Sequence, residues 1–379
     1  MDGEWGLFFF EFIVAHSGSN LSTCNGLKKC PEWGILCFME FWDYLNETLR
    51  PCETCNTLVL DLFAGAGGLS MGFEAAGFKT IGYEMDRAAC ETYNKNLSGE
   101  CHEKKLTARF EYPKADIVIG GPPCQPFSVR GYQKGASDTR NGFPVFVDAI
   151  RQLQPSLFLF ENVRGLLYAN KKYFETLVDE LKNLGYIIEH KLCNAVNYGV
   201  PQNRERLFVA GHRGKFRFPA PHKNWTTAGE AIGDIMHTTP PESKFLTPAM
   251  DAYVAAYEKA SCCVNPRDLY PDKPARTLTC RNLAGATSDM QRVRLPDGRR
   301  RRLLHREAAR LQSFPDWFEF CGNETQQFNQ IGNAVPPLLA YQLALSVKEY
   351  MHAGALYETD DILDARYDIE MEDCPLFQQ

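Results

Sequence analysis

The sequence has no long apolar run, no surplus of positive charge and no internal repeat. The apolar stretch at residues 7–15 is too short to cross a bilayer and contains Glu11. Asp2 and Glu4 give the N-terminus the wrong charge for a secretory signal. Because the formal net charge is −6, bulk charge does not indicate a nucleic-acid partner, and local clusters must decide that question. We expect a cytoplasmic protein with no membrane partner.

Two nucleotide-binding motifs are also missing. No G-x-x-x-x-G-K-[ST] sequence occurs. The turn at residues 61–72 (DLFAGAGGLSMG) contains Gly65 and Gly67, but Ser70 stands where a dinucleotide fingerprint requires its third glycine. A nicotinamide dehydrogenase is therefore disfavoured. Glycines at such a turn still let a ligand approach the backbone, and the N-terminus of the following helix favours a negatively charged group.

Two acids extend this turn into a candidate adenosyl pocket. Glu84 ends the second strand, where a ribose diol would be held, and Asp116 begins the next strand, near the place of a base amino group. Ribose and base contacts without a phosphate-binding loop predict an adenosyl ligand that lacks phosphates. The alternative is that the glycines only form a tight turn between a strand and a helix.

Apolar strands alternate with amphipathic helices through much of the chain. This alternation predicts an α/β fold with a doubly wound, mostly parallel sheet and helices on both faces. It ends near Arg213, and a last helix follows at about residues 336–352. The expected strands are 57–62, 79–86, 115–121, 156–162, 185–192 and 206–213, and the expected helices between them begin near residues 68, 87, 144 and 171.

Cys124 lies just after the expected strand 115–121, at the edge where open α/β sheets bind ligands. Pro122 and Pro123 fix the backbone before it, and the glycine-containing residues 131–142 would let the following loop close over a substrate. A thiolate is a strong nucleophile, so a cysteine held in this way is a candidate catalytic group. The alternative is a buried, inert cysteine in a tight turn.

Charged side chains lie at the ends of two further strands. Glu161 ends the strand 156–162, beside the end of the Cys124 strand, and between apolar neighbours it is a candidate proton donor. Arg204 and Arg206 are two residues apart and so share one face of a strand. Their guanidinium groups could pair with Glu161 and with a substrate carbonyl oxygen. The alternatives are a surface acid and a solvated charge run.

The cysteines and the arginines have uneven distributions. Fourteen scattered cysteines are typical of free thiols in a reducing compartment. Cys24, Cys30, Cys52 and Cys55 could hold one zinc ion, but the first spacing is wide and no histidine completes the set, so we expect no metal. Residues 276–310 contain ten arginines against three acids, a surplus of positive charge that could contact DNA phosphates.

Taken in order, these motifs resemble those of the DNA (cytosine-5)-methyltransferases, a family of class I S-adenosylmethionine-dependent enzymes. The resemblance covers about residues 57–350. The matching segments are 61–68 (DLFAGAGG), Glu84, 119–128 (IGGPPCQPFS), 161–163 (ENV), 202–206 (QNRER), 305–316 (HREAARLQSFPD) and 330–337 (QIGNAVPP).

The resemblance implies a domain organisation and a reaction. An N-terminal extension (1–55) precedes a catalytic S-adenosylmethionine domain (56–213) and a target-recognition domain with the basic segment (214–328). A helix (329–352) then returns to the catalytic domain, before an acidic tail (353–379). The implied reaction is methyl transfer from S-adenosylmethionine to carbon 5 of a flipped-out cytosine in a specific DNA sequence.

The resemblance also implies roles for individual residues. Cys124 is expected to add to carbon 6 of cytosine, Glu161 to protonate nitrogen 3, and Arg206 to contact the carbonyl oxygen, with Arg204 nearby. The implied cofactor contacts are Phe63, Ala66, Gly68, Glu84, Met85, Asp116, Ile117, Pro123 and Asn333, of which Met85 stands where the family often has an aromatic residue. The implied DNA contacts are Gln125, Ser128, Arg299, Arg300, Arg301 and Arg302.

Two related functions are kept as alternatives. A tRNA methyltransferase of the same family would carry Cys-Phe-Thr in the recognition region, where this chain has SCCVN at 261–265. A catalytically silent nucleic-acid-binding protein is disfavoured by the intact Cys124, Glu161 and Arg206. We expect double-stranded DNA as the substrate, a monomer, a functional link to a cognate restriction endonuclease, and a location at the nucleoid, or in the nucleus of a eukaryote.

Overall fold

The structure is a computed structural model that describes residues 27–29, 36–52, 54–123, 141–260, 262, 267–284 and 290–355. The chain divides into two compact units, Met1–Glu40 and Phe41–Gln379. In the first unit, β1 (Leu27–Lys29) and β2 (Leu36–Phe38) pair antiparallel. Helix α1 (Phe41–Thr48) belongs to the second unit, so the division falls at residue 40 and not at the expected residue 55.

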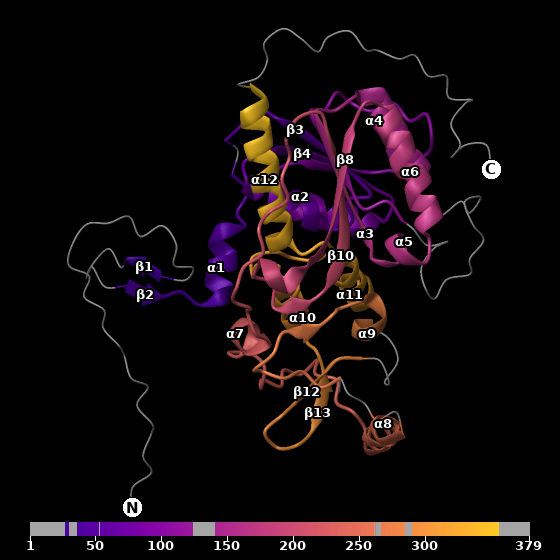
Figure 1. The fold of residues 1–379 in the computed structure, drawn as a ribbon. Coiled ribbons are helices and arrows are strands. Elements are labelled where there is room, and N and C mark those ends of the chain that lie inside the picture. Colours follow the sequence, from indigo (N-terminus) through magenta and orange to yellow (C-terminus); the bar gives the residue numbers. More distant parts are fainter. Residues whose placement is uncertain are drawn as a thin grey trace, which may run out of the picture. The chain divides into compact units, whose positions relative to one another are not determined.

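A seven-stranded sheet forms the centre of the second unit (Figure 1). Six of its strands run parallel, and β10 runs antiparallel to both of its neighbours. The order across the sheet is β5 (Glu100–Glu103), β4 (Lys79–Glu84), β3 (Leu58–Leu62), β6 (Ile117–Gly120), β7 (Leu157–Val163), β10 (Glu205–His212) and β8 (Ile187–Asn194). The expected α/β class with a mostly parallel sheet is confirmed, while β5 and the direction of β10 were not expected.

Helices cover both faces of this sheet, because alternate strand residues point to opposite sides. In β3, Val59 joins one apolar cluster and Leu60 joins the other. Figure 1 shows α12 close to α2 on one side and α4 and α6 on the other. The first cluster involves α2 (Gly68–Ala75), α3 (Arg87–Asn96) and α12 (Pro337–Ala355), and the second involves α4 (Phe143–Leu153), α5 (Gly165–Tyr168) and α6 (Lys171–Asn183).

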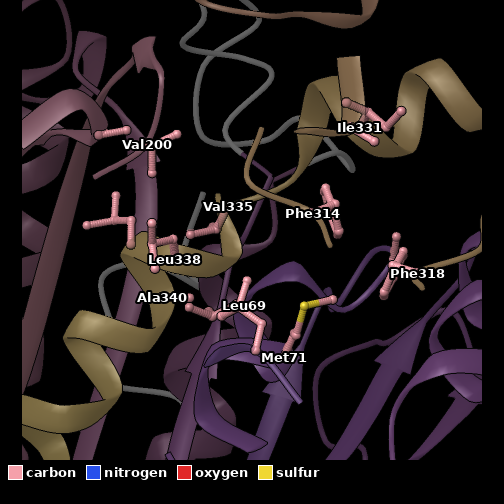
Figure 2. Packing of buried hydrophobic residues seen from close by; sticks show 14 of the residues in the cluster. Leu69, Met71, Val200, Phe314, Phe318, Ile331, Val335, Leu338 and Ala340 are labelled. Atoms are coloured by element: carbon pink, nitrogen blue, oxygen red, sulfur yellow. The ribbon is translucent and has the colours of Figure 1, made fainter. Parts of the chain in front are cut away.

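The last helix packs against the first helix of the sheet domain. A side chain at Gly72 of α2 would place its Cβ 2.3 Å from the backbone nitrogen of Tyr341 and 2.4 Å from the carbonyl carbon of Ala340. Only glycine allows the two helix backbones to approach so closely. Figure 2 shows the apolar contact that this approach creates, with Leu69 of α2 beside Leu338 and Ala340 of α12. The C-terminal helix thus packs on α2, the helix that follows β3.

Short elements lie before and after β10, and those that follow it form the lower part of the molecule in Figure 1. A two-stranded parallel pair, β9 with β11, connects them to the sheet domain. A second antiparallel pair, β12 with β13, carries the arginine-rich sequence. The elements are η2 (Ala195–Tyr198), β9 (Gln202–Asn203), α7 (Ala228–Ile232), α8 (Pro248–Ala260), β11 (Ala275–Arg276), α9 (Cys280–Ala284), β12 (Arg292–Arg294), β13 (Arg300–Arg302), α10 (His305–Leu311) and α11 (Glu324–Asn333).

Among the described residues, no helix is both long and apolar enough to span a membrane.

Candidate active site

Three strand ends meet at one edge of the sheet. The carboxyl ends of β6 and β7 lie side by side, since Gly120 pairs with Phe160. Because β10 is antiparallel, its amino end lies at the same edge, and Arg206 pairs with Val163. Arg206, near the start of the reversed strand, therefore lies at the edge where the parallel strands end.

Glu161 and Arg206 form an ion pair at this edge. Nε of Arg206 lies 2.8 Å from Oε1 of Glu161, and each side chain is only 15% exposed. Arg206 also donates a hydrogen bond to the carbonyl oxygen of Glu205 at 2.8 Å, which fixes the orientation of its guanidinium group. The pair that the sequence predicted is thus brought together in a sheltered position, where charge-assisted hydrogen bonds are strong.

The residues that frame Cys124 are held in place, although Cys124 itself lies outside the described residues, as do Gln125 and Ser128. The Asn162 side-chain amide donates to the carbonyl oxygen of Pro122 at 3.0 Å. The Gly142 amide donates to the carbonyl oxygen of Pro123, also at 3.0 Å. Asn162 therefore anchors the turn that leads into Cys124, a role that its position in the ENV motif could have indicated.

A cavity of about 440 Å³ opens beside the ion pair. Its walls combine Val163 and Arg206 with polar groups that the sequence pattern alone does not indicate, namely Arg164, Asn194, Asn203, Glu205 and Thr277. Arg164 and Glu205 pair at 2.8 Å across the exposed side of this cavity. A volume of this size, with a few convergent polar groups, is typical of small-ligand and substrate sites.

Arg204 forms structural hydrogen bonds to the backbone. Its side chain is buried and donates to three backbone carbonyl oxygens, those of Leu278 (2.6 Å), Gly332 (3.0 Å) and Ala334 (3.0 Å). It therefore connects the start of β10 to α9 and to the turn between α11 and α12. Its two terminal guanidinium nitrogens are thus engaged by the backbone, so the contacts of Arg204 do not support the catalytic role beside Arg206 that the resemblance implies.

The glycine turn after β3 leaves space above its backbone. Gly65 has φ +55°, and a Cβ built on it would have no heavy atom within 4 Å. Its amide donates to Oε2 of Glu84 at 2.9 Å. Glu84 Oε1 accepts from the Met85 and Asp86 amides at 2.8 Å, so the carboxylate is fixed at the end of β4. Met85 is 68% exposed. Glu84 thus lies at the glycine turn, as expected.

Phe63 and Gly68 belong to the same turn, and Asn333 lies two residues before Val335, which abuts it. Phe63 and Pro123 both contact Gly142, since a Cβ there would lie 3.0 Å from the Phe63 ring and 2.4 Å from Pro123 Cδ. Gly68 abuts the α11–α12 turn, because a Cβ there would be 2.5 Å from the carbonyl oxygen of Val335. The Cys280 thiol donates to Oδ1 of Asn333 at 2.8 Å. Ala66 is buried within the turn.

Asp116 and Ile117 lie at the opposite edge of the sheet, so the expectation that they contact the cofactor is wrong. Asp116 precedes β6, and its carboxylate accepts from the amide of Leu58, the first residue of β3, at 2.8 Å. Ile117 is fully buried in the apolar cluster. Ligand sites of parallel sheets lie at the carboxyl ends of the strands, not at the amino ends. The end of β5 does lie at the carboxyl edge, because its last residue, Glu103, pairs with Glu84 at the end of β4.

Ser70, which breaks the dinucleotide pattern, forms a buried hydrogen bond beneath the turn. Its hydroxyl group donates to Oδ2 of Asp61 at 2.7 Å. Within the described residues, Oδ1 of Asp61 has no hydrogen-bond partner. Burial therefore raises the pKa of Asp61 to about 7, although the Ser70 hydrogen bond opposes this rise. The serine that stands in place of the third glycine thus provides a hydrogen bond to the buried Asp61 carboxyl group, which precedes the turn.

The Asp61 carboxyl should make stability depend on pH. Its folded pKa lies above the unfolded value, so the native state holds the proton more tightly and loses stability as the pH rises from about 4 to about 7. We expect Asp61→Asn to gain about 2 kcal/mol of unfolding free energy relative to the wild type between pH 5 and pH 8. Urea unfolding of the ligand-free protein at both pH values measures this. The exposed Asp179→Asn is the control, and a pH-independent difference for Asp61→Asn would contradict the assignment.

The four consecutive arginines of the basic segment have different environments. Arg301 is fully buried and forms two hydrogen bonds with the buried Glu307, at 2.8 and 2.7 Å. Arg300 is mostly buried and pairs with Asp251 (3.1 Å) and Asp268 (3.0 Å). Arg299 is exposed, pairs with Asp297 and lies over the Phe245 ring. Arg302 is half-buried. The expectation that Arg301 contacts DNA is wrong, and Arg300 is already neutralised.

Acids from other parts of the chain offset much of the positive surplus. Asp268 alone contacts Arg292, Arg294 and Arg300. Its burial would raise its pKa, but the arginines hold the pKa below its usual value. Asp234, Glu258 and Asp316 pair with further arginines of the segment. Since these acids lie outside residues 276–310, the charge count along the sequence overstated the free positive charge.

The structure describes two of the four cysteines that were considered for zinc. Cys52 and Cys55 are free thiols, and Cys55 donates a hydrogen bond to the carbonyl oxygen of Gly77 at 3.1 Å. Cys24 and Cys30 lie outside the described residues. In the part of the chain that the structure describes, no three His, Cys, Asp or Glu side chains are grouped as a metal site.

Comparison with solved structures identifies similar folds. The Dnmt2 methyltransferase of S. pombe aligns with a TM-score of 0.61 and 17% identity, over 78% of this chain and 99% of that chain. The Entamoeba histolytica methyltransferase EhMeth aligns with the same score and identity, over 79% and 99%. At this level of identity the likeness concerns the fold.

Comparison of sequences gives closer relatives. The Type II methyltransferase M.AplI of Arthrospira platensis is 56% identical over 315 residues, which are 82% of this chain and 91% of that protein. M1.HphI of Haemophilus parahaemolyticus is 36% identical over 368 residues, 88% and 97% of the two chains. Residues 58–349, which contain the sheet, the Glu161–Arg206 pair and the glycine turn, match the model of the C-5 cytosine-specific DNA methylases, and the chain belongs to this family.

Proposed function

We propose that this chain methylates carbon 5 of cytosine within one specific DNA sequence, as the modification enzyme of a restriction-modification system. The reaction of the family is transfer of a methyl group from S-adenosylmethionine to cytosine in DNA, and this is the reaction of the chain. The observation that supports the site is the sheltered Glu161–Arg206 pair, next to the turn that carries Cys124 and to a polar cavity. The relatives at 56% and 36% identity are named Type II methyltransferases, which supports the modification role.

The residues of the site divide the chemistry between them. The Cys124 thiolate forms a bond to carbon 6 of the flipped cytosine, and Glu161 gives a proton to nitrogen 3, so that carbon 5 becomes electron-rich. Arg206 orients the Glu161 carboxyl group and contacts the carbonyl oxygen of the base. After carbon 5 has gained the methyl group, a base removes its proton and the bond between sulfur and carbon 6 breaks. Gln125 and Ser128 follow Cys124 and are assigned to the backbone of the flipped nucleotide.

The glycine turn fits S-adenosylmethionine. Open space over Gly65, a fixed carboxylate at Glu84 and the absence of a phosphate-binding loop suit an adenosyl group without phosphates. We assign Phe63, Ala66, Gly68, Pro123 and Asn333 to the cofactor, and the end of β5, in place of Asp116, to its adenine base. The Cβ contacts of Gly68 and Gly142 and the pairing of Glu103 with Glu84 support this assignment. The cofactor, when bound, supplies an electrophilic methyl group. Met85 is exposed beside Glu84 and is assigned to the adenine face.

Arg276 is a better candidate for a DNA phosphate contact than Arg301. It is exposed, belongs to β11, and precedes Thr277, which lines the cavity beside Arg206. We expect Arg276→Gln to weaken binding to all DNA sequences alike and to reduce the slope of log Kd against log salt concentration by about 1, as for the loss of one phosphate contact. Fluorescence anisotropy between 50 and 300 mM salt measures this.

The matched control for Arg276 is Arg294→Gln. Arg294 is also an exposed arginine, 57% accessible, but it already pairs with Asp268 at 3.3 Å. We expect Arg294→Gln to change the slope of log Kd against log salt concentration by less than half as much as Arg276→Gln does. An unchanged slope for Arg276→Gln would remove this residue from the DNA interface.

The function is tested with labelled S-adenosylmethionine and bisulfite sequencing. Label should enter duplex DNA, and conversion-resistant cytosines in a plasmid from the expression host should define one recognition sequence. DNA with 5-fluorocytosine at that position should form a denaturation-resistant adduct with the wild type and not with Cys124→Ala, since fluorine cannot leave as the proton does. Label in tRNA but not in DNA would favour the tRNA alternative.

We propose that the enzyme acts as a monomer, that it is located with the DNA at the nucleoid, and that a cognate restriction endonuclease recognises the same sequence. Size-exclusion chromatography with light scattering measures the first of these. Cleavage of unmodified plasmid by an extract of the source cells, and protection of the modified plasmid, tests the third.

A further inference from the structure

Helix α1 lies outside the residues that match the family model, yet it is closely packed in the second unit. The match begins at residue 58, whereas α1 covers Phe41–Thr48. Leu45 and Leu49 are fully buried in the same apolar cluster as α2 and α12. The helix is therefore an integral part of this unit, and its polar contacts indicate what it does.

The polar contacts of α1 converge on one corner of the chain, residues 310–318. Oδ1 of Asn46 accepts from the Asp316 amide at 2.7 Å, and its carbonyl oxygen accepts from Nε1 of Trp317 at 3.2 Å. The Arg310 guanidinium lies 4.9 Å from the centroid of the Trp42 ring. The side chain and the carbonyl group of Asn46 thus accept hydrogen bonds from this corner. The Trp42 ring packs on the guanidinium group of Arg310 at its start.

Hydrogen bonds within the corner join its two ends, and one of its side chains contacts the glycine turn. Arg310 forms two hydrogen bonds with Asp316, at 2.8 and 2.7 Å. Between them, Ser313 has φ +65° and its hydroxyl group accepts from the Leu338 amide at 3.1 Å. Phe314 then points to α2, since its Cζ lies 3.4 Å from the Cβ position of Gly68. Figure 2 shows Phe314 near Val335 and above Leu69 and Met71.

We propose that α1 is a positioning element for the S-adenosylmethionine pocket, acting through this corner. Asn46 holds the backbone of Asp316, and Trp42 packs on the Arg310 side chain. The corner places Phe314 against Gly68, and Gly68 in turn abuts Val335, two residues after Asn333. Without the α1 contacts, Phe314 and Gly68 are held less firmly beside the cofactor pocket, while every group of the Glu161–Arg206 site remains. This inference rests on the proposed assignment of the glycine turn to the cofactor.

The test measures cofactor affinity separately from catalysis. Asn46→Ala and Trp42→Ala in the full chain are compared with the wild type by calorimetric titration of S-adenosylhomocysteine without DNA. We expect Kd to rise about threefold to tenfold in each variant, since each loses a partly buried polar or cation–π contact. The KM for S-adenosylmethionine should rise in parallel, while kcat at saturating cofactor and the KM for DNA stay within twofold of the wild type.

Two further variants separate positioning from general destabilisation. Trp42→Phe keeps a ring under Arg310 and should recover most of the affinity, whereas the exposed Asp43→Asn on the same helix should bind as the wild type does. Unchanged Kd values in Asn46→Ala and Trp42→Ala, or an equal loss of cofactor and DNA affinity together with a lower Tm, would overturn the proposal. If the wild type fails to bind S-adenosylhomocysteine, the cofactor assignment fails instead.

Discussion

Replacement of Glu161 by glutamine is expected to lower kcat by about 10² to 10⁴, the usual contribution of a positioned acid or base. Glutamine has nearly the same shape and can still accept a hydrogen bond from Arg206, which lies 2.8 Å from the carboxylate. It cannot give a proton to nitrogen 3 of cytosine, so carbon 5 stays a poor nucleophile. Single-turnover methyl transfer from labelled S-adenosylmethionine measures the effect, with Cys124→Ala as the reference for complete loss.

The binding constants distinguish this chemical defect from a structural one. Since Glu161 is not assigned to the cofactor pocket, the Kd for S-adenosylhomocysteine should stay within twofold of the wild-type value. The exposed Glu175→Gln, whose carboxylate pairs with Lys171 on α6, is the matched control and should keep full activity. A kcat within threefold of the wild type in Glu161→Gln would rule out the proton transfer that we assign to this residue.

Replacement of Arg301 by methionine is expected to lower the free energy of unfolding by about 3–5 kcal/mol, the typical cost of breaking a buried ion pair. Arg301 and Glu307 are both fully buried, and the arginine also donates to the carbonyl oxygens of Met236 and Thr238. Without the guanidinium group, the Glu307 carboxylate would be left in an apolar environment with no cation. Urea unfolding monitored by circular dichroism measures the loss as a lower midpoint at constant m-value.

Two variants show whether the pair or the charge is responsible. Arg301→Met combined with Glu307→Leu should recover much of the lost stability, because an apolar pair can replace a buried ion pair at little cost. The control Arg299→Met removes an exposed ion pair with Asp297 and the contact with the Phe245 ring, and it should cost much less than Arg301→Met because exposed ion pairs contribute little to stability. A stable Arg301→Met protein with weakened DNA binding would instead restore Arg301 to the DNA interface.

The α/β architecture could be predicted because its signals are local. Runs such as 156–162 are apolar and end in a charged residue, and the glycine turn after residue 61 marks where a strand passes into a helix. Since neighbouring parallel strands end at the same edge, Glu84 and Glu161 could be assigned to that edge from these runs alone. The structure confirms the strand positions, and it brings Glu84 to the glycine turn and Glu161 to Arg206.

Two errors show where local patterns are insufficient. Asp116 is expected near the base because it begins a strand, but the amino end of a parallel strand lies at the edge opposite the ligand site, where Asp116 accepts a hydrogen bond from Leu58. Arg204 and Arg206 are equivalent in sequence, yet only Arg206 meets Glu161. Arg204 is surrounded by carbonyl groups that lie 74 and 128 residues away in the chain, those of Leu278 and Gly332. The spacing of two arginines does not contain that information.

The sequence by itself indicated most strands and helices of the sheet domain, the family and the residue types of the candidate catalytic site, because each is written in short, contiguous patterns. Only the tertiary structure decided which charges are free. Arg299 and Arg301 are two residues apart, but one is exposed and the other is paired with Glu307 inside the protein. The reason is physical: an ion pair depends on the distance between two groups after folding, and burial of a charge requires a partner that another segment must supply.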